Sequence, residues 1–93
     1  MSQHTRGIVR ELMDEPHVAG HRVSVRQIHT LVEERGRDAR TVADSLSLDV
    51  SDVYLALAYY HDNPREMTAV EQRRERRLEQ SRERGAVAGP EDL

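Results

Sequence analysis

The spacing of apolar residues in the middle of the chain predicts two helices joined by a short turn. Residues 25–35 place an apolar side chain every three or four positions, as do residues 39–46, and this spacing puts side chains on one helix face. Ser24 and Asp38 directly precede these segments and are favoured N-cap residues, and Gly36 suits the end of the first helix. We therefore expect two short amphipathic helices.

A third helix is expected between Asp49 and Asn63, and its apolar residues surround the whole helix. Every residue from Val53 to Tyr60 is apolar or aromatic, whereas a surface helix of a small domain normally carries a single apolar stripe. The domain core can cover only one side of this helix, so the other side needs a separate explanation. The predicted core-facing residues are Val53, Ala56, Leu57 and Tyr60.

The other side of the third helix is a candidate protein interface. Left uncovered, its side chains would form an apolar patch of the kind that marks interaction sites, and tyrosine combines an apolar ring with a polar hydroxyl. Two kinds of cover are compatible with the sequence: another subunit, which we favour, or a segment of the same chain, either residues 1–23 or residues 64–78. The candidate interface residues are Tyr54, Leu55, Ala58 and Tyr59.

The two ends of the chain differ from this helical middle. Residues 1–23 contain short apolar runs separated by turn residues, which are typical of a short strand or hairpin. Asn63 and Pro64 suit the start of a fourth helix. Residues 65–84 contain seven arginines and five glutamates, and residues 85–93 show no helical pattern.

Together these elements predict a mainly α fold. Three helices joined by short turns, the second short and the third longer, are typical of a helix-turn-helix core. A short N-terminal β-strand or hairpin precedes this core and a charged C-terminal helix follows it. The predicted organisation is an extended or β segment at 1–23, the helix-turn-helix core at 24–63, the charged helix at 64–84 and a disordered tail at 85–93.

Composition narrows the class of protein. The chain has 93 residues, a net charge of −3 and no cysteine, so disulfides and thiolate zinc sites are excluded and one small intracellular domain is expected. No run approaches the roughly 18 apolar residues of a membrane-spanning helix, and the N-terminal residues lack the apolar stretch of a signal peptide. We expect a cytoplasmic protein.

No pattern in the sequence predicts catalysis, a cofactor or a metal site. The chain lacks a nucleophile spaced for a His/Asp pair and a Gly-rich phosphate loop. Of the five histidines, His17 and His21 are separated by Gly20 and the others are scattered, so they do not form a recognisable ligand set. We expect a non-catalytic protein with no small-molecule substrate.

Nucleic acid is a candidate partner, because a helix-turn-helix inserts its last helix into the major groove. The third helix of this chain is poorly suited to base contacts, since it would present Asp52 and Asp62 and no arginine. Arginines elsewhere are candidates for contacts with backbone phosphates, with a solvated surface as the alternative. These arginines are Arg22, Arg26, Arg35, Arg37 and Arg40.

The charged helix at 64–84 has two interpretations. It is either a solvated helix held by intrahelical ion pairs or a segment that binds a partner. We favour the second, because so few apolar residues give the helix little reason to pack on its own domain. The candidate partner contacts are Met67, Val70, Arg74, Arg77 and Leu78.

The stretch from Gly20 to Met67 resembles domain-of-unknown-function family 433. The resemblance is carried by "GHRVSV" before the first helix, "ERGRDARTVAD" at the first turn and "LDVSDVYLALAYYHDNP" in the third helix. The family contains small bacterial and archaeal proteins with a homeodomain-like helix-turn-helix. The arginine-only basic residues and the arginine–glutamate helix are similar to those of haloarchaeal members.

This resemblance implies a function. Family members are often considered antitoxins of the VapB type, which pair with a PIN-like ribonuclease toxin, bind it through a C-terminal segment and bind their own operator DNA as dimers. We therefore expect a homodimeric antitoxin-like protein that blocks the acidic metal site of such a nuclease with residues 64–84. The alternative is a stand-alone helix-turn-helix DNA-binding transcription regulator.

Overall fold

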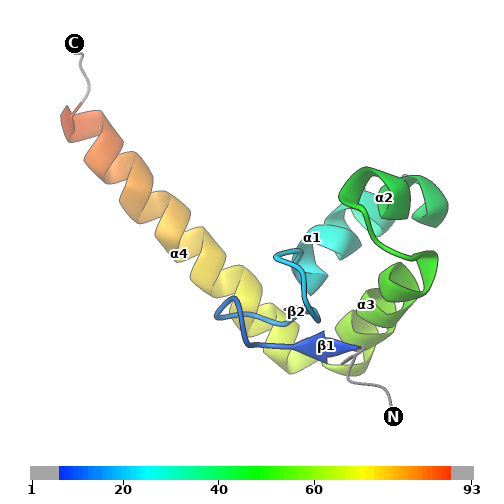
Figure 1. The fold of residues 1–93 in the computed structure, drawn as a ribbon. Coiled ribbons are helices and arrows are strands. Elements are labelled where there is room, and N and C mark those ends of the chain that lie inside the picture. The colour runs from blue at the N-terminus through cyan, green and yellow to red at the C-terminus, as the bar shows by residue number, and fades with distance from the viewer. Residues whose placement is uncertain (1–6, 89–93) are drawn as a thin grey trace.

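The computed structural model describes residues 7–88, which form a mainly helical fold with a short N-terminal hairpin, as the sequence predicts. Figure 1 shows a group of short helices and a last helix that extends away from them. The elements in chain order are β1 (Ile8–Val9), β2 (His17–Val18), α1 (Val25–His29), the π-helix η1 (Thr30–Glu34), α2 (Ala39–Leu46), α3 (Val50–Asp62) and α4 (Pro64–Ala88).

The predicted N-terminal hairpin is formed by β1 and β2. The two strands are antiparallel, and Ile8 lies opposite Val18. After β2 the chain turns at Gly20, whose φ of +79° favours a residue without a Cβ. The chain then returns, and Ser24 forms a bridge with His17. This bridge fixes the position of Ser24, the residue directly before α1, next to β2.

The first predicted helix is present, but its second half is a π-helix. The Ser24 Oγ accepts a hydrogen bond from the Gln27 amide at 3.0 Å, which confirms the predicted N-cap. The Arg35 amide donates to the Thr30 carbonyl five residues earlier, at 2.9 Å, and this is the hydrogen bond of a π-helix. Gly36 follows with a φ of +70° and ends the helix as predicted.

Caps fix both ends of α2 and the start of α3. The Asp38 carboxylate accepts hydrogen bonds from two amides in the first turn of α2, at 3.1 and 3.2 Å. At the other end Ser47 adopts a left-handed backbone, with φ +58°. Asp49 then caps α3 in a capping box with Asp52. Short, well-capped turns therefore hold the three central helices together, as the helix-turn-helix prediction requires.

The core lies where α3 packs against α1 and α2, and β2 and the first turns of α4 complete it. The predicted core positions on α3 are confirmed: Val53 and Ala56 are buried, and Leu57 and Tyr60 are half-buried against the same cluster. The buried apolar residues are Val18, Val25, Ile28, Val42, Ala43, Leu48, Val53, Ala56, Met67 and Val70.

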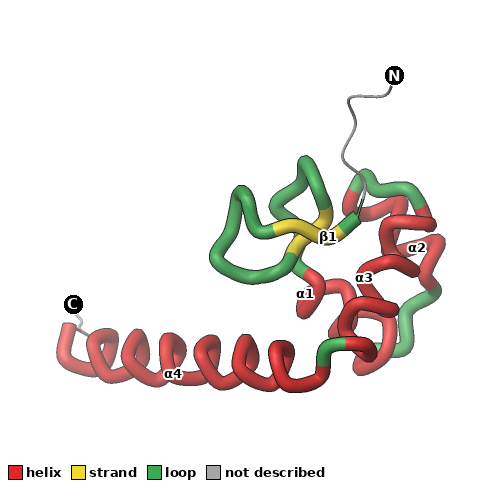
Figure 2. Tube along the Cα trace, turned by 90° about the horizontal axis from the view of Figure 1, so that it is seen from below, coloured by secondary structure: helices red, strands yellow, loops and turns green. Residues whose placement is uncertain are grey.

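The molecule is elongated because α4 is much longer than the domain on which it starts. The principal extents are 54 × 25 × 24 Å and the radius of gyration is 15.9 Å, whereas a compact chain of this length would have a radius of about 12 Å. Figure 2, seen from below, shows α4 running past the hairpin loops and ending far from the other helices.

The end of α4 differs from the sequence prediction. The helix continues to Ala88, so residues 85–88 of the predicted disordered tail are helical, and residues 89–93 lie outside the described residues. Between Arg82 and Ala88 good helix formers outnumber the single Gly85, and a helix that is already nucleated adds residues at little cost. No helix within residues 7–88 has the length and apolar character needed to cross a membrane.

Candidate functional site

The strongest candidate site is the free part of α4, residues 74–88, which we call the arm. Every side chain from Arg74 to Glu83 is exposed, and Leu78 exposes 44 % of its surface. Figure 1 shows the arm extending beyond the hairpin with open space around its end. An ion pair between Arg77 and Asp14, at 3.1 Å, joins the start of the arm to the domain. A long exposed helix of this kind is available to a partner.

Charge is divided between the arm and the rest of the chain. The arm contains five arginines and three glutamates, a net charge of +2, whereas residues 1–73 carry −3 and residues 89–93 carry −2. Arginine guanidinium groups bind carboxylates and phosphates through paired hydrogen bonds. The arm is therefore suited to an acidic surface, while the domain would repel one.

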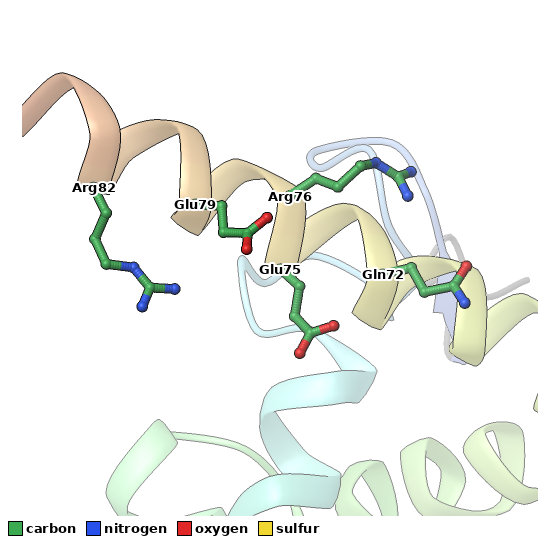
Figure 3. A pocket seen from close by; sticks show the side chains of 5 residues that line it. All are labelled: Gln72, Glu75, Arg76, Glu79 and Arg82. Carbon is green, nitrogen blue, oxygen red and sulfur yellow. The ribbon is translucent and has the colours of Figure 1, made fainter.

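The arm presents two different faces. Arg74, Arg77 and Leu78 follow Val70 at spacings of four, seven and eight residues, so they continue the helix face whose first part is buried. On the opposite side Figure 3 shows a shallow hollow between charged side chains. All five lining residues belong to α4, so the hollow is an open surface and not an enclosed cavity; they are Gln72, Glu75, Arg76, Glu79 and Arg82.

Two of the predicted partner contacts on this helix belong to the core. Met67 is 1 % exposed and Val70 is 3 % exposed, because the first turns of α4 pack against α1 and α3. The expectation that Met67 and Val70 anchor a partner is therefore wrong. Among the predicted contacts, Arg74, Arg77 and Leu78 are exposed.

The base of α4 is tied to the N-terminal loop through Tyr59. The Tyr59 hydroxyl donates to Glu66 and accepts a hydrogen bond from the Arg10 guanidinium at 2.9 Å, and Arg10 also pairs with Glu66. Tyr59 is consequently half-buried, which agrees at this residue with the alternative that residues 1–23 cover part of this face. This part of the third helix is covered by the chain's own N-terminal segment.

The remaining predicted interface residues on α3 are open. Tyr54 exposes 59 % of its surface and Leu55 39 %, and Ala58 is exposed. They lie on the side of α3 that faces away from the core. These three residues, which we call the α3 patch, form an apolar surface typical of a contact site.

The five candidate phosphate-binding arginines divide into two groups. Arg35, Arg37 and Arg40 are exposed around the turn between η1 and α2. The other two lie near the hairpin loop: Arg22 donates to the Leu12 carbonyl at 2.7 Å, and the half-buried Arg26 faces Glu15 at 3.9 Å. The structure therefore leaves the first group as the better candidate for DNA contacts.

The start of α3 also bears on DNA binding. Asp52 is expected from the sequence to face the DNA groove, but its side chain is only 9 % exposed. Its carboxylate instead accepts a hydrogen bond from the Asp49 amide at 3.1 Å. The expected exposure of Asp52 is therefore wrong, because the capping box turns its side chain toward the backbone. The exposed residues of α3 nevertheless include acidic and apolar side chains but no arginine.

A polar cluster that the sequence did not reveal lies between α1, η1 and α3. His29 is 8 % exposed and stacks on Tyr60 with ring centroids 3.6 Å apart and planes 4° from parallel. His61 Nε2 lies 2.8 Å from Glu33. The four-residue spacing of His29 and Glu33 was visible in the sequence, but the approach of His61 depends on how α3 packs.

Negative charge surrounds this cluster. Burial and the carboxylates of Glu71, Glu34 and Glu33 raise the pKa of Tyr60 above its ordinary value. The Tyr60 hydroxyl also points to Glu71 at 3.5 Å. A cation at this position would therefore meet several carboxylates.

The fold and the exposed surfaces define a class: a small helix-turn-helix domain that carries a free, charged helical arm. A family model described as protein of unknown function (DUF433) matches residues 12–60, more than half of the chain. The chain belongs to this family, which confirms the resemblance of its central motifs. The comparisons with curated proteins and with solved structures gave no match. The family match ends at Tyr60, so α4 lies outside it.

Proposed function

We propose that this protein is a non-catalytic, antitoxin-like binding protein whose arm binds and neutralises a PIN-like ribonuclease toxin. The observation that carries the proposal is the continuous exposure of α4 from Arg74 to Glu83 on a helix whose base is buried. The nature of the partner follows from what the resemblance to family 433 implies, since members of this family are often considered antitoxins of the VapB type. The proposal places the protein in the cytoplasm, where such a toxin would cleave RNA.

The charge of the arm supports an acidic partner surface. A nuclease that holds catalytic metal ions does so with carboxylates, which are the ligands that such ions prefer. An arm with a net charge of +2 would be attracted to this surface, and an inserted arginine would pair with carboxylates and exclude RNA. Inhibition would therefore come from occlusion and needs no chemical step by this chain.

The buried base of α4 also supports this role. Short isolated helices are marginal in water because their first turn is costly to form. Here Met67 and Val70 hold the first turns against the core, so the arm starts from a formed helix. Preorganisation of this kind lowers the entropy lost on binding.

Co-purification from native cells tests the proposal. The complete chain and a chain that ends at Arg73 would be purified after nuclease treatment, and bound proteins identified by mass spectrometry. Ending at Arg73 keeps Met67 and Val70, so the domain stays folded. We expect a PIN-like nuclease in equal amounts with the complete chain and its absence with the shorter one. Recovery of the complete chain alone would contradict the proposal.

Two matched double variants would locate the contact on the arm. Arg74→Ala with Arg77→Ala changes the face that continues from the core, and Arg76→Ala with Arg82→Ala changes the opposite face equally in charge. Removing arginines from the centre of an interface typically weakens binding by about tenfold or more. We expect this weakening for the first pair and a smaller effect for the second, measured as dissociation constants. Equal effects would indicate general attraction between charges and contradict a specific face.

The α3 patch supports a second part of the proposal, that two copies of the chain form a homodimer. Tyr54, Leu55 and Ala58 are exposed on the side of α3 away from the core. A contact between two such patches would bury them both, and contacts of this self-complementary type are the commonest in homodimers.

A stand-alone transcription regulator is the alternative function, and the exposed Arg35, Arg37 and Arg40 favour it. If these arginines bind phosphates, changing all three to alanine should weaken DNA binding at every sequence. The slope of log K against log salt should also fall by about 0.9 for each phosphate that the variant no longer neutralises. Fluorescence anisotropy with labelled operator DNA at several salt concentrations would measure both. DNA affinity that is unchanged in the triple variant would exclude this arrangement.

A further inference from the structure

The cluster between α1, η1 and α3 brings together three side chains that are common metal ligands. His29, Glu33 and His61 each offer one ligand atom, and these atoms all lie within 4.8 Å of one another. His61 Nε2 is 2.8 Å from one Glu33 carboxylate oxygen and 2.9 Å from the other. His29 Nε2 is 3.5 Å from Glu33 Oε1. The cluster shares no residue with the arm or with the α3 patch.

These separations are close to those around a bound transition-metal ion. Zinc binds histidine nitrogen and carboxylate oxygen at about 2.0–2.2 Å in tetrahedral geometry, which places ligand atoms about 3.3–3.6 Å apart. The His29–Glu33 distance of 3.5 Å lies within this range, and the His61–Glu33 distance of 2.8 Å is shorter than it. Small rotations of the exposed Glu33 and His61 side chains would therefore suffice to admit an ion.

The buried member of the set is held in one orientation. The His29 ring is stacked on Tyr60, which prevents it from turning freely. Its Nδ1 is buried without a hydrogen-bond partner, at 3.8 Å from a Glu34 carboxylate oxygen. A carboxylate beside one imidazole nitrogen favours the tautomer that leaves the other nitrogen free to bind a metal. In His29 that other nitrogen is Nε2, which faces Glu33.

The π-helix explains why both carboxylates lie beside the same imidazole. Residues four and five positions after His29 are Glu33 and Glu34. In an α-helix only the fourth would share its face, whereas the wider turn of η1 brings the fifth close as well. π-helical segments are frequent at functional sites.

We propose that His29, Glu33 and His61 bind a divalent transition-metal ion such as Zn²⁺. Two imidazoles and one carboxylate are a ligand set that zinc, cobalt and nickel accept, whereas Mg²⁺ and Ca²⁺ prefer oxygen ligands alone. A bound ion would join the end of α1 and η1 to the C-terminal part of α3, across the helix-turn-helix core.

A second ligand group shares His29 with Glu34 and Glu71. It contains one nitrogen and two carboxylates, and it would use Nδ1 of His29 instead of Nε2. The first group has two imidazoles and is the better set for zinc. The two arrangements can be distinguished by substitution: changes of Glu33 or His61 weaken metal binding only in the first, and a change of Glu71 weakens it only in the second.

Titration with Co²⁺ tests the proposal on the complete chain without an affinity tag. Tetrahedral Co²⁺ absorbs visible light, and isothermal calorimetry with Zn²⁺ gives the stoichiometry. We expect one ion for each chain and a raised thermal midpoint on binding. His61→Ala and Glu33→Gln should each weaken binding by about a hundredfold or more, an effect beyond the roughly 10–100-fold of outer-shell changes. Both side chains are exposed, so these variants keep the fold.

His21→Ala is the matched control, because His21 lies in the turn that follows β2, outside the cluster. It should bind the metal as the unchanged chain does, and Glu71→Gln should do the same. No binding by the unchanged chain, or equal affinity in His61→Ala, would overturn the proposal. Weakened binding only in Glu71→Gln would assign the ion to the second group instead.

Discussion

Tyr60 is the residue at which three helices meet. Its ring stacks on His29 of α1, and its hydroxyl points to Glu71 of α4 at 3.5 Å. Burial and the nearby carboxylates raise the pKa of Tyr60, because they make the ionised phenolate less favourable than it would be in water. The residue therefore connects the stability of the fold to pH.

Folding stability should decline above pH 10 because of Tyr60. Between the pKa of the unfolded state, about 10, and the higher pKa of the folded state, the folded protein binds more protons. The free energy of unfolding then falls as the pH rises. We expect this decline to be steeper in the unchanged protein than in Tyr60→Phe, as measured by urea unfolding at pH 9 to 11.

The composition makes this measurement unusually direct. The chain has no lysine and no cysteine, and arginine stays charged in this range, so these residue types do not contribute to the pH dependence. Tyr54→Phe is the matched control: it retains Tyr60 and should retain the steep decline. The explanation would fail if Tyr60→Phe and Tyr54→Phe showed the same dependence on pH.

Helix α4 has a buried base and an exposed arm, although both carry apolar residues on one face. Met67 is 1 % exposed and Leu78 44 % exposed, and they lie three turns apart on that face. The base belongs to the domain, and the arm is free to meet a partner. Under the proposed function, one helix would therefore complete the core with its base and bind the partner with its arm.

Shortening these two side chains should change the free energy of unfolding by very different amounts. Met67→Ala should lower the free energy of unfolding by about 2–5 kcal/mol, because it opens a cavity in the core. Leu78→Ala should change it by no more than about 0.5 kcal/mol, since its side chain is exposed. Urea unfolding followed by circular dichroism would measure both. Similar decreases in the two variants would show that the arm packs on the domain.

Much of the fold could be predicted from the sequence because caps and apolar spacing are local signals. Ser24, Asp38, Gly36 and the start of α4 at Pro64 all lie where the sequence places them. Burial on α4 could not be predicted, because a methionine or valine at helical spacing fits a core and an interface equally well. Only the packing of α4 on α1 and α3 separates the two.

The candidate sites divide in the same way. The exposure of Tyr54 and Leu55 follows from an apolar helix with one side in the core. The histidine cluster could not be predicted, because His29 and His61 are 32 positions apart in the sequence and meet only when α3 packs on α1. The π-helix that brings Glu34 beside His29 has no sequence signal that we could use.

At the scale of the whole molecule, an acidic domain carries a basic arm. The arm has a net charge of +2 and residues 1–73 have −3, and the long axis of 54 Å reflects the distance to which the arm extends. Because the arm and the domain carry charges of opposite sign, they favour different partner surfaces: an acidic one for the arm and a basic or neutral one for the domain. This arrangement suits a protein that assembles through its domain and binds another protein with its arm.

The proposed homodimer predicts a mass of two chains in solution. Light scattering is the suitable measurement, because the elongated shape would distort a size estimated from elution volume. Tyr54→Ser with Leu55→Ser should reduce the mass to that of one chain, 10.7 kDa, while Leu78→Ser on the arm should leave it unchanged. A mass of one chain for the unchanged protein at all concentrations would contradict the dimer.

The most direct test of the central claim is the ribonuclease activity of the co-purified partner. RNA cleavage would be followed with increasing amounts of the complete chain and, separately, of the chain that ends at Arg73. The account predicts that the complete chain abolishes RNA cleavage when one chain is present for each nuclease molecule. The chain without the arm should leave cleavage unchanged. Equal inhibition by the two chains, or inhibition by neither, would contradict the claim that the arm neutralises the nuclease.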